Sequence, residues 1–297
     1  MSKTFKSILV TGGSGQVGYE LCRALSAFGS ILAPSRDELD LSDANAVDVY
    51  LAKHQPDLIV NPAAWTAVDA AETHQNEATR LNTALPAQLA KYADKHNAYL
   101  VHYSTDYVYA GTGDKPWLES DTPAPLSVYG QTKLAGDQAV VHHCKNHLIF
   151  RTSWVYADRG NNFLKTMLKL GEQRDSLNIV NDQFGAPTNA RMIAQVTALA
   201  IYRKLLNQPI ESGVYHLVNN GVTNWYGFAE AIFKQARLNN LPLKLDKLGG
   251  ISTAEFPTPA ARPANSRLNV SKLENALGIK LPNWQQQLEY TLNSYLK

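Results

Sequence analysis

The sequence predicts an α/β protein, in which a doubly wound parallel sheet is followed by a smaller C-terminal lobe. Short apolar runs alternate with helix-like segments as far as Tyr156, and the alternation weakens beyond it. A glycine-rich turn joins the first apolar run to the first helix. Strands that alternate with helices indicate right-handed crossover units and a parallel sheet covered on both faces. Such sheets bind ligands beyond the carboxyl ends of their strands, so we expect the functional site there.

The elements are expected in the following order. Short apolar runs predict buried strands over residues 7–12, 30–35, 57–64, 98–104 and 147–156. Helices are predicted between them, over residues 21–28, 47–54, 79–96 and 127–143. The segment VYHLVN, residues 214–219, is predicted to return to the sheet, whereas most of 221–297 mixes helix with proline-rich connection. We therefore place one domain over residues 1–156, completed by this return strand, and the lobe mostly over residues 157–297.

The composition is that of an ordinary globular protein. The 297 residues are 44% hydrophobic and 18% charged, with a formal net charge of +2. Lysine and arginine are scattered, so we expect neither a nucleic-acid partner nor a membrane surface. Cys22 and Cys144 are too few for a disulfide framework and lack the spacing of metal ligands. The first apolar run is too short for a signal peptide and no stretch could span a bilayer, so a cytoplasmic location is expected.

Gly12, Gly15 and Gly18 lie directly between the first strand and the first helix, in the segment TGGSGQVG. Without side chains, they permit a tight turn, close approach of the backbone to a pyrophosphate, and close helix–strand packing. The helix N-terminus also offers free N–H groups to an anion. Three spaced glycines alone are a weak signal, because other strand–helix turns use them. Their position in the first crossover unit favours a dinucleotide site.

The end of the second strand should meet the adenosine ribose of that dinucleotide. An acidic residue there favours NAD, and an arginine favours the additional phosphate of NADP. The chain carries Ser35, Arg36 and Asp37, which leaves NADPH and NADH both open. Arg36 mildly favours NADPH, and a solvated loop charge is an equally good interpretation. Asp40 and Leu41 follow, and we place them beside the adenine.

Tyr129 and Lys133 are four residues apart on one face of a predicted helix, in the only Tyr-x-x-x-Lys of the chain. A tyrosine near its ordinary pKa of about 10 transfers protons poorly at neutral pH, and a neighbouring ammonium lowers that pKa. Lys133 can also hold a nicotinamide ribose. Thr105 ends the preceding strand, where its hydroxyl would join Tyr129 at a substrate oxygen. Each residue alone would indicate only a helix-surface pair or a turn, but together they predict a catalytic set.

These residues resemble those of the extended short-chain dehydrogenase/reductase superfamily. Further segments are similar to the dTDP-4-dehydrorhamnose reductase family and, with the glycine loop, run from residue 12 to residue 269: GQVG, NPAAWTAVDAAE, STDYVYAGTG, VYGQTKLAG, FRTSWVYA, NNFLKTML, NDQFGAPT and RPANSRLN. The resemblance implies a Rossmann domain that binds NAD(P), with a small substrate-binding lobe. It also implies NAD(P)H-dependent reduction of the C4 ketone of dTDP-4-dehydro-6-deoxy-L-mannose to dTDP-L-rhamnose, which feeds cell-surface polysaccharide.

The resemblance assigns roles to the catalytic residues and the cofactor residues. Tyr129 is implied to protonate the sugar oxygen, Thr105 to hydrogen-bond that oxygen, and Lys133 to tune Tyr129 and bind the ribose. The other residues implied to line the cofactor are Gln16, Val17, Ala63, Ala64, Trp65 and Thr66. Small residues such as the two alanines would equally suit close strand–helix packing.

Three further residues are implied to bind the sugar nucleotide. Asp106 would hold a sugar hydroxyl, and Trp154 would offer the sugar a flat face and one N–H donor. Arg262 suits a diphosphate because its guanidinium can bind in a bidentate manner. The competing interpretations are a turn-capping aspartate, a core tryptophan and a surface arginine.

The residue after Asp106 distinguishes between reactions. Dehydratases of the superfamily resemble one another in carrying Thr-Asp-Glu, whose acid and base eliminate water, whereas this chain has Thr105-Asp106-Tyr107. Elimination is therefore disfavoured and a ketone reduction is expected. A related nucleotide-sugar 4-ketoreductase or an epimerase on the same scaffold stays open, as does a non-enzymatic partner of the kind represented by the regulatory subunit of methionine adenosyltransferase. The intact Thr105, Tyr129 and Lys133 favour an enzyme.

One departure from the family concerns metal. Some members resemble one another in binding Mg²⁺ at a dimer interface through glutamates. Arg191 stands where one such glutamate is expected, although Glu20 matches another. An arginine opposes a divalent cation, so we predict no catalytic metal and regard a metal-bridged homodimer as doubtful.

Overall fold

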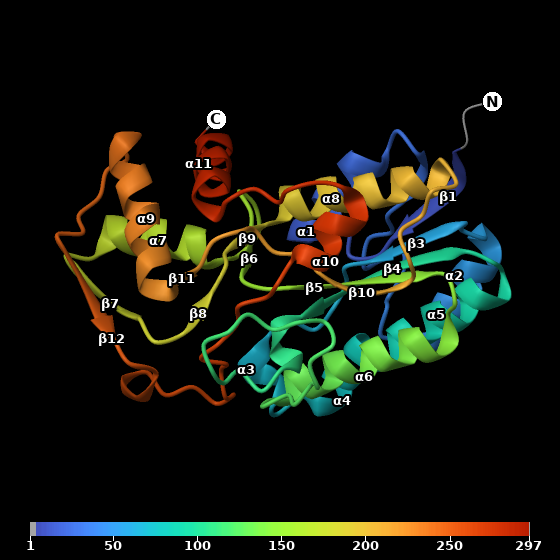
Figure 1. Cartoon of the computed structure of the whole chain (residues 1–297), viewed down its shortest axis with the longest axis horizontal. Coiled ribbons are helices and arrows are strands. Elements are labelled where there is room, and N and C mark those ends of the chain that lie inside the picture. The colour runs from blue at the N-terminus through green and yellow to red at the C-terminus, as the bar shows by residue number, and fades with distance from the viewer. Residues whose placement is uncertain (1–3, 297) are drawn as a thin grey trace.

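The computed structural model describes residues 4–296 and has a six-stranded parallel sheet at its centre (Figure 1). The strands lie side by side in the order β10-β5-β4-β3-β1-β2. Their bounds are β1 Phe5–Val10, β2 Gly29–Leu32, β3 Leu58–Asn61, β4 Tyr99–Thr105, β5 His147–Thr152 and β10 Gly213–His216. Because β1 is flanked by β2 on one side and β3 on the other, successive connections wind in opposite directions from it. This confirms the predicted doubly wound α/β class.

Helices cover both faces of the sheet. One face is covered by α1 (Gln16–Leu25), α8 (Ala190–Leu205) and α10 (Ser271–Leu277), and the other by α2 (Ala44–His54), α5 (Leu85–Lys95) and α6 (Val128–His143). Side chains of β1 alternate between the faces: Ile8 and Val10 pack under the first set, and Leu9 packs under the second. This period of two, with apolar residues on both faces, is why the strands read as continuous apolar runs.

A smaller lobe lies beyond the carboxyl edge of the sheet, at the left of Figure 1. Its core is formed by α7 (Phe163–Gln173), α9 (Trp225–Leu238) and α11 (Trp284–Tyr295), and includes Phe228, Phe233 and Leu288. A parallel strand pair, β7 (Ser176–Val180) and β12 (Lys247–Ile251), lies beside them. The remaining short elements are β6 Val155–Tyr156, β8 Phe184–Gly185, β9 Thr188–Asn189, β11 Thr223–Asn224, α3 Val68–Ala71, α4 Gln75–Thr79, a π turn Arg80–Ala84, and the 3₁₀ turns Asp106–Val108 and Thr253–Glu255.

The strand predicted over residues 147–156 is broken in the structure. Backbone pairing in β5 ends at Thr152, and Trp154 has a left-handed backbone with φ of 48°. A bulky residue with positive φ cannot continue an extended strand. The chain resumes as β6, which pairs with β9 instead of the main sheet. The break therefore carries the chain out of the sheet and into the lobe.

No helix within residues 4–296 is both long and apolar enough to cross a membrane.

Candidate active site

The candidate site lies at the carboxyl edge of the sheet, where β1, β3 and β4 end side by side. Gly12 follows β1, Ala63 follows β3, and Thr105 is the last residue of β4. A Cβ atom added to Gly12 would lie 3.3 Å from Ala63, so the two loops are in contact. The winding of the sheet reverses at this edge, which is where doubly wound folds form their ligand crevice.

The glycine loop has the geometry of an anion cradle. Gly12 adopts φ of +58°, and a Cβ on Gly18 would lie 2.1 Å from the Gly12 carbonyl oxygen, so a side chain at Gly18 would clash with the backbone of the loop. Gly15 caps the N-terminus of α1 without any side-chain hydrogen bond. The first N–H groups of α1 are consequently available to a pyrophosphate, as the dinucleotide prediction requires.

Gln16 and Val17 begin α1. The Gln16 Oε1 accepts a hydrogen bond of 2.8 Å from the Asn162 side chain, so the loop before α7 rests on this end of the helix. Val17 is half-buried and packs against the core under α1. Gln16 thus links the cofactor loop to the lobe.

The residues predicted beside the adenosine lie beyond the end of β2. Ser35, Arg36 and Asp40 are exposed, and Leu41 is half-buried. The hydroxyl and backbone N–H of Ser42 hold the pKa of the Asp40 carboxyl below its usual range. Arg36 is exposed to solvent beyond the end of β2, where a ribose phosphate could reach it.

The segment after β3 includes the four other predicted cofactor residues. The Ala63 backbone N–H donates to the Thr11 hydroxyl at 3.3 Å, and the Trp65 backbone N–H donates to Asn82 Oδ1 at 2.9 Å. Ala63, Ala64 and Trp65 are half-buried and Thr66 is exposed. Ala63 packs on the glycine loop, so close packing and cofactor contact are compatible at this position.

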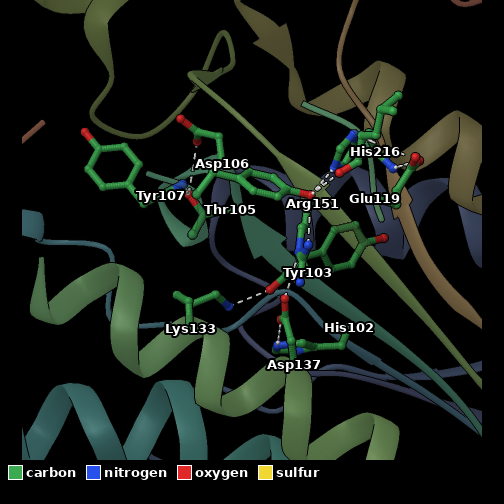
Figure 2. Close-up of polar contacts among 12 residues, drawn as sticks. His102, Tyr103, Thr105, Asp106, Tyr107, Glu119, Lys133, Asp137, Arg151 and His216 are labelled. Carbon is green, nitrogen blue, oxygen red and sulfur yellow. Dashed lines mark hydrogen bonds and ion pairs between the residues drawn. The ribbon is translucent and has the colours of Figure 1, made fainter. Parts of the chain in front are cut away.

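Thr105 and Tyr129 lie together at the edge of the sheet. Tyr129 is half-buried on the first turn of α6; burial raises the pKa of its phenol and a hydrogen bond with Thr105 opposes that rise. The Thr105 hydroxyl donates to Asp106 Oδ1 at 3.1 Å and accepts from the Tyr107 backbone N–H at 3.2 Å. Figure 2 shows Thr105 and Asp106 beside Tyr107. The rings of Tyr107 and Tyr129 meet edge to face, with centroids 5.4 Å apart.

Lys133 lies one turn after Tyr129 on α6, but its ammonium points elsewhere. The Nζ atom donates a 2.5 Å hydrogen bond to the Tyr103 backbone carbonyl (Figure 2). Burial lowers the pKa of Lys133 to about 8, and Asp137 opposes that fall. The expectation that Lys133 lowers the pKa of Tyr129 is not met in this structure. The two groups share a helix face, but burial has the larger effect on the phenol and the ammonium is engaged by β4.

Asp106 is enclosed rather than presented to solvent, with 2% of its surface exposed. Its Oδ2 accepts a short hydrogen bond from the Ser266 hydroxyl. Burial raises the pKa of Asp106 to about 6, against the hydrogen bonds from Ser266 and Thr105. Ser266 was not singled out from the sequence, although it lies in the segment RPANSRLN.

Trp154 is stacked on a second indole. The rings of Trp154 and Trp225 are parallel to within 18°, with centroids 3.9 Å apart, and Gly185 packs against the same indole. One face of Trp154 is therefore covered by Trp225. Trp225 was missed, because a lone tryptophan at the start of a helix gives no signal of its partner.

The Arg262 guanidinium is engaged in a bidentate ion pair. Its Nη1 and Nη2 donate to the two carboxylate oxygens of Asp69 at 2.9 and 2.8 Å. Asp69 raises the pKa of Arg262, and the side chain of Arg262 stays about one quarter exposed. The adjacent Pro263 packs on Gly111, so tightly that a Cβ at Gly111 would lie 2.4 Å from it. The Arg262 guanidinium expected to bind a diphosphate is partly accessible, but in this structure it binds the Asp69 carboxylate.

Arg191 forms ion pairs with two acidic residues. Its Nε lies 3.3 Å from Glu20 Oε2, and its Nη2 lies 3.6 Å from Asp158 Oδ2. The three residues line a cavity of ≈ 250 Å³ with Tyr290 and Ser294. Within residues 4–296 no cluster of three or more histidine, cysteine, aspartate or glutamate side chains could hold a metal ion. A guanidinium at Glu20 places a fixed positive charge where a cation would have to bind.

Comparison with known proteins gives a consistent picture. Residues 6–297 match the family described as the RmlD substrate binding domain. The chain is 49% identical to a dTDP-4-dehydrorhamnose reductase of Escherichia coli K12 over 97% of both chains. It is similar to the crystal structure of a dTDP-4-dehydrorhamnose reductase from Clostridium acetobutylicum, with TM-score 0.90, 34% identity, and coverage of 98% of this chain and 100% of that one. A Bacillus anthracis dTDP-4-dehydrorhamnose reductase in complex with NADP gives TM-score 0.88, 32% identity, and coverage of 97% and 99%. The similarity therefore extends over both the sheet and the lobe.

Proposed function

This chain belongs to the dTDP-4-dehydrorhamnose reductase family, and from that membership we propose that it reduces the C4 ketone of dTDP-4-dehydro-6-deoxy-L-mannose to dTDP-L-rhamnose. NADPH or NADH is the hydride source. The observation that carries the proposal is the placement of two side-chain hydroxyls, those of Thr105 and Tyr129, at the sheet edge that also carries the glycine loop. Hydroxyls placed there can meet a carbonyl oxygen held against a bound dinucleotide.

The glycine loop supports the cofactor part of the proposal. The free N–H groups at the uncapped N-terminus of α1 would bind the pyrophosphate. Gly12 and Gly18 would allow it to approach closely, because they place no side chain in the loop. Lys133 would bind the nicotinamide ribose, and Arg36 would meet the adenosine side. When bound, the reduced nicotinamide supplies the hydride that is added to the sugar C4.

Tyr129 would donate the proton that the new alkoxide requires. Burial raises the pKa of its phenol, so the side chain is protonated at neutral pH and able to donate. Thr105 would hydrogen-bond the same oxygen as negative charge develops on it. The protonated phenol is the form that a reductase requires, because its tyrosine must act as an acid in the direction of reduction.

Three residues would bind the sugar nucleotide. Arg262 would release Asp69 and form the same bidentate contact with the diphosphate. The indole of Trp154, backed by Trp225, would present its free edge to the sugar. Asp106 is held ready by Ser266 to accept a hydrogen bond from a sugar hydroxyl.

We further propose that the protein acts in the cytoplasm on a soluble sugar nucleotide. If a homodimer forms, it would do so without a bridging metal, since Arg191 already neutralises Glu20. The division into a domain over residues 1–156 and a lobe mostly over 157–297 is likewise proposed, with α8, β10 and α10 assigned to the sheet.

The experiment is an assay of reduced-nicotinamide consumption with the 4-keto sugar nucleotide, run separately with NADPH and NADH. We expect turnover with product dTDP-L-rhamnose, and Tyr129→Phe should lower kcat roughly 10²–10⁴-fold while cofactor binding persists. Near-full turnover in Tyr129→Phe would remove the phenol from the reaction. Cofactor binding without oxidation on any nucleotide-sugar ketone would instead favour a non-enzymatic binding partner, and return of the cofactor unchanged would favour an epimerase.

A further inference from the structure

A cluster of buried ionisable side chains lies around Lys133. Lys133 and Asp137 are four residues apart on the face of α6 that packs against β4 and β5, and both are 2% exposed. His102 comes from β4 and Arg151 from β5. Figure 2 shows all four side chains converging beneath the active-site edge. None of them except Lys133 has a role in the reduction described above.

Arg151 fixes the Asp137 carboxylate. The Arg151 Nε donates to Asp137 Oδ2 at 3.0 Å, and its Nη1 donates to the Tyr109 hydroxyl at 2.8 Å. Burial raises the pKa of Asp137, and Arg151 and Lys133 oppose that rise. A guanidinium at hydrogen-bond distance keeps the carboxylate ionised. The other oxygen, Oδ1, is buried and has no protein hydrogen-bond partner.

His102 lies near that second oxygen as a neutral ring, beyond hydrogen-bond distance. The Nδ1 atom is 3.1 Å from the Asn61 amide nitrogen, while Asn61 Oδ1 accepts from the Thr11 hydroxyl at 2.6 Å. Because Asn61 donates to Nδ1, the ring proton of a neutral His102 resides on Nε2, 4.0 Å from Asp137 Oδ1. Burial and Lys133 hold the pKa of His102 well below its ordinary value. His102 therefore adds no charge to the cluster.

The charges in the cluster do not balance without Asp137. Lys133 and Arg151 are the two cations, Tyr109 and Tyr129 are neutral because burial raises their pKa values, and His102 is neutral. Of these groups, Asp137 alone is anionic. If its charge were removed, two buried cations would remain. Arginine retains its proton in proteins, so Lys133 is the group that would lose one.

Resting on the proposed function, we propose that Asp137 is a positioning residue for Lys133. Its carboxylate is the counter-ion that keeps the buried ammonium charged on the Tyr103 carbonyl, so that the ammonium can hold the ribose of the cofactor. Arg151 holds the Asp137 carboxylate in position, and the nearby Nε2–H of His102 favours the ionised form of that carboxylate. Tyr129, Lys133 and Asp137 thus form one functional face of α6, each about one turn after the one before it.

The test follows the pH dependence of NADPH affinity, measured by cofactor fluorescence without sugar. In the wild-type protein, affinity should fall as pH rises through about 8, the pKa of Lys133. In Asp137→Asn the pH at which NADPH affinity falls should be about 1–3 units lower. The NADPH affinity of this variant at pH 7.5 should therefore be roughly tenfold weaker than that of the wild type, and it should recover on acidification. A merely structural role would weaken binding equally at every pH.

Two further variants separate charge from folding. Asp137→Glu keeps the charge and should restore the wild-type profile. The double variant Asp137→Asn/Arg151→Met removes one charge of each sign, and should shift the profile back although it disturbs more contacts. Glu274→Gln neutralises another buried carboxylate, on α10 and paired with Lys280, and should leave the profile unchanged.

The outcomes are distinct. A profile that does not move in folded Asp137→Asn, or a double variant that binds worse at every pH than the single variant, overturns the role of Asp137. If Asp137→Asn does not fold, the profiles of Asp137→Glu and the double variant decide in the same way. If the NADPH affinity depends on pH as described but the protein reduces no 4-keto sugar, the positioning role of Asp137 stands and the proposed function is rejected.

Discussion

Asp106 is a carboxylate with 2% of its surface exposed, held by the hydroxyls of Thr105 and Ser266. Burial raises its pKa to about 6, from an ordinary value of 3.8. A carboxyl whose pKa is higher in the folded state than in the unfolded state lowers stability as the pH rises from the unfolded value to the folded value, and the full cost is present above the folded value. The site thus retains an ionised group at neutral pH that the fold would more easily accommodate as a neutral one, as binding sites often do.

Asp106→Asn should therefore stabilise the protein and impair its activity. Between pH 4 and pH 6 the native state binds the additional proton, so the stability of the wild type decreases over this range as pH rises. At pH 7.5 the variant should gain about 1–3 kcal/mol in its free energy of unfolding, and the gain should vanish near pH 4. Urea denaturation at the two pH values measures it. A gain of the same size at both would show that ionisation is not its cause.

At the residue scale, the sequence predicts which residue types come together at the site better than it predicts which side chains contact one another. Thr105 and Tyr129 were found because hydroxyls after a strand and on the next helix suit a carbonyl. The direction of the Lys133 ammonium was not predictable, because it depends on the Tyr103 carbonyl and the buried Asp137, which pack against it only in the fold. Ser266 and Asp69 were missed for the same reason: their partners are 160 and 193 residues away in the chain.

At the scale of elements, the glycine loop is a tightly packed turn. Gly18 lies so close to the Gly12 carbonyl that no side chain fits without moving the backbone. The loop and the N-terminus of α1 form one unit, because the close contact between Gly12 and Gly18 sets the direction in which the helix begins. Cofactor binding should depend on this contact more than on any single side chain of the loop.

Gly18→Ala should weaken NADPH binding at least roughly tenfold, or about 1.4 kcal/mol, and lower the melting temperature. The added methyl would stand 2.1 Å from the Gly12 oxygen, so the loop must shift away from its anion-binding form. Gly113→Ala is the control: φ of +77° makes it strained, but no atom lies within 4 Å of the added Cβ. It should lose stability and keep cofactor affinity. Equal NADPH binding in both variants would contradict the assignment of the loop.

The strands and helices of the sheet were predictable because apolar runs of this length and spacing occur in few other folds. The break at Trp154 was not. The segment FRTSWVY has the apolar and β-branched residues of a continuous strand, and only the stacking of Trp154 on Trp225 and Gly185 explains why the chain turns there. Long-range packing overrides local preference at this position.

At the scale of the whole molecule, the ion pair between Arg262 and Asp69 joins two segments that are 193 residues apart in the chain. Asp69 belongs to the short helix α3 after β3, and Arg262 follows the loop that leads back from β12. The pair is partly exposed, so its own contribution to stability is small. Its importance lies in holding the Arg262 guanidinium partly exposed, where a diphosphate could reach it.

Arg262→Ala should raise KM for the sugar nucleotide by roughly ten- to hundredfold, or about 1.5–3 kcal/mol, with kcat changed much less. Asp69→Asn is the matched variant, because it removes the partner while leaving the fork free to bind a diphosphate. It should leave KM unchanged or lower it. Steady-state kinetics of the two variants would reject the diphosphate role if Asp69→Asn raised KM as much as Arg262→Ala did.

The order of the strands in the sheet also bears on how the chain is made. When residue 156 has been synthesised, five strands of the main sheet exist, but the edge strand β10 and the covering helices α8 and α10 do not. β5 would then be paired with β4 on one side only, and Phe150 would lack the helices that cover it. The nascent first half of the chain therefore exposes apolar surface until these later segments have been synthesised. A cell that produces this protein therefore has reason to shield the growing chain until its last hundred residues arrive.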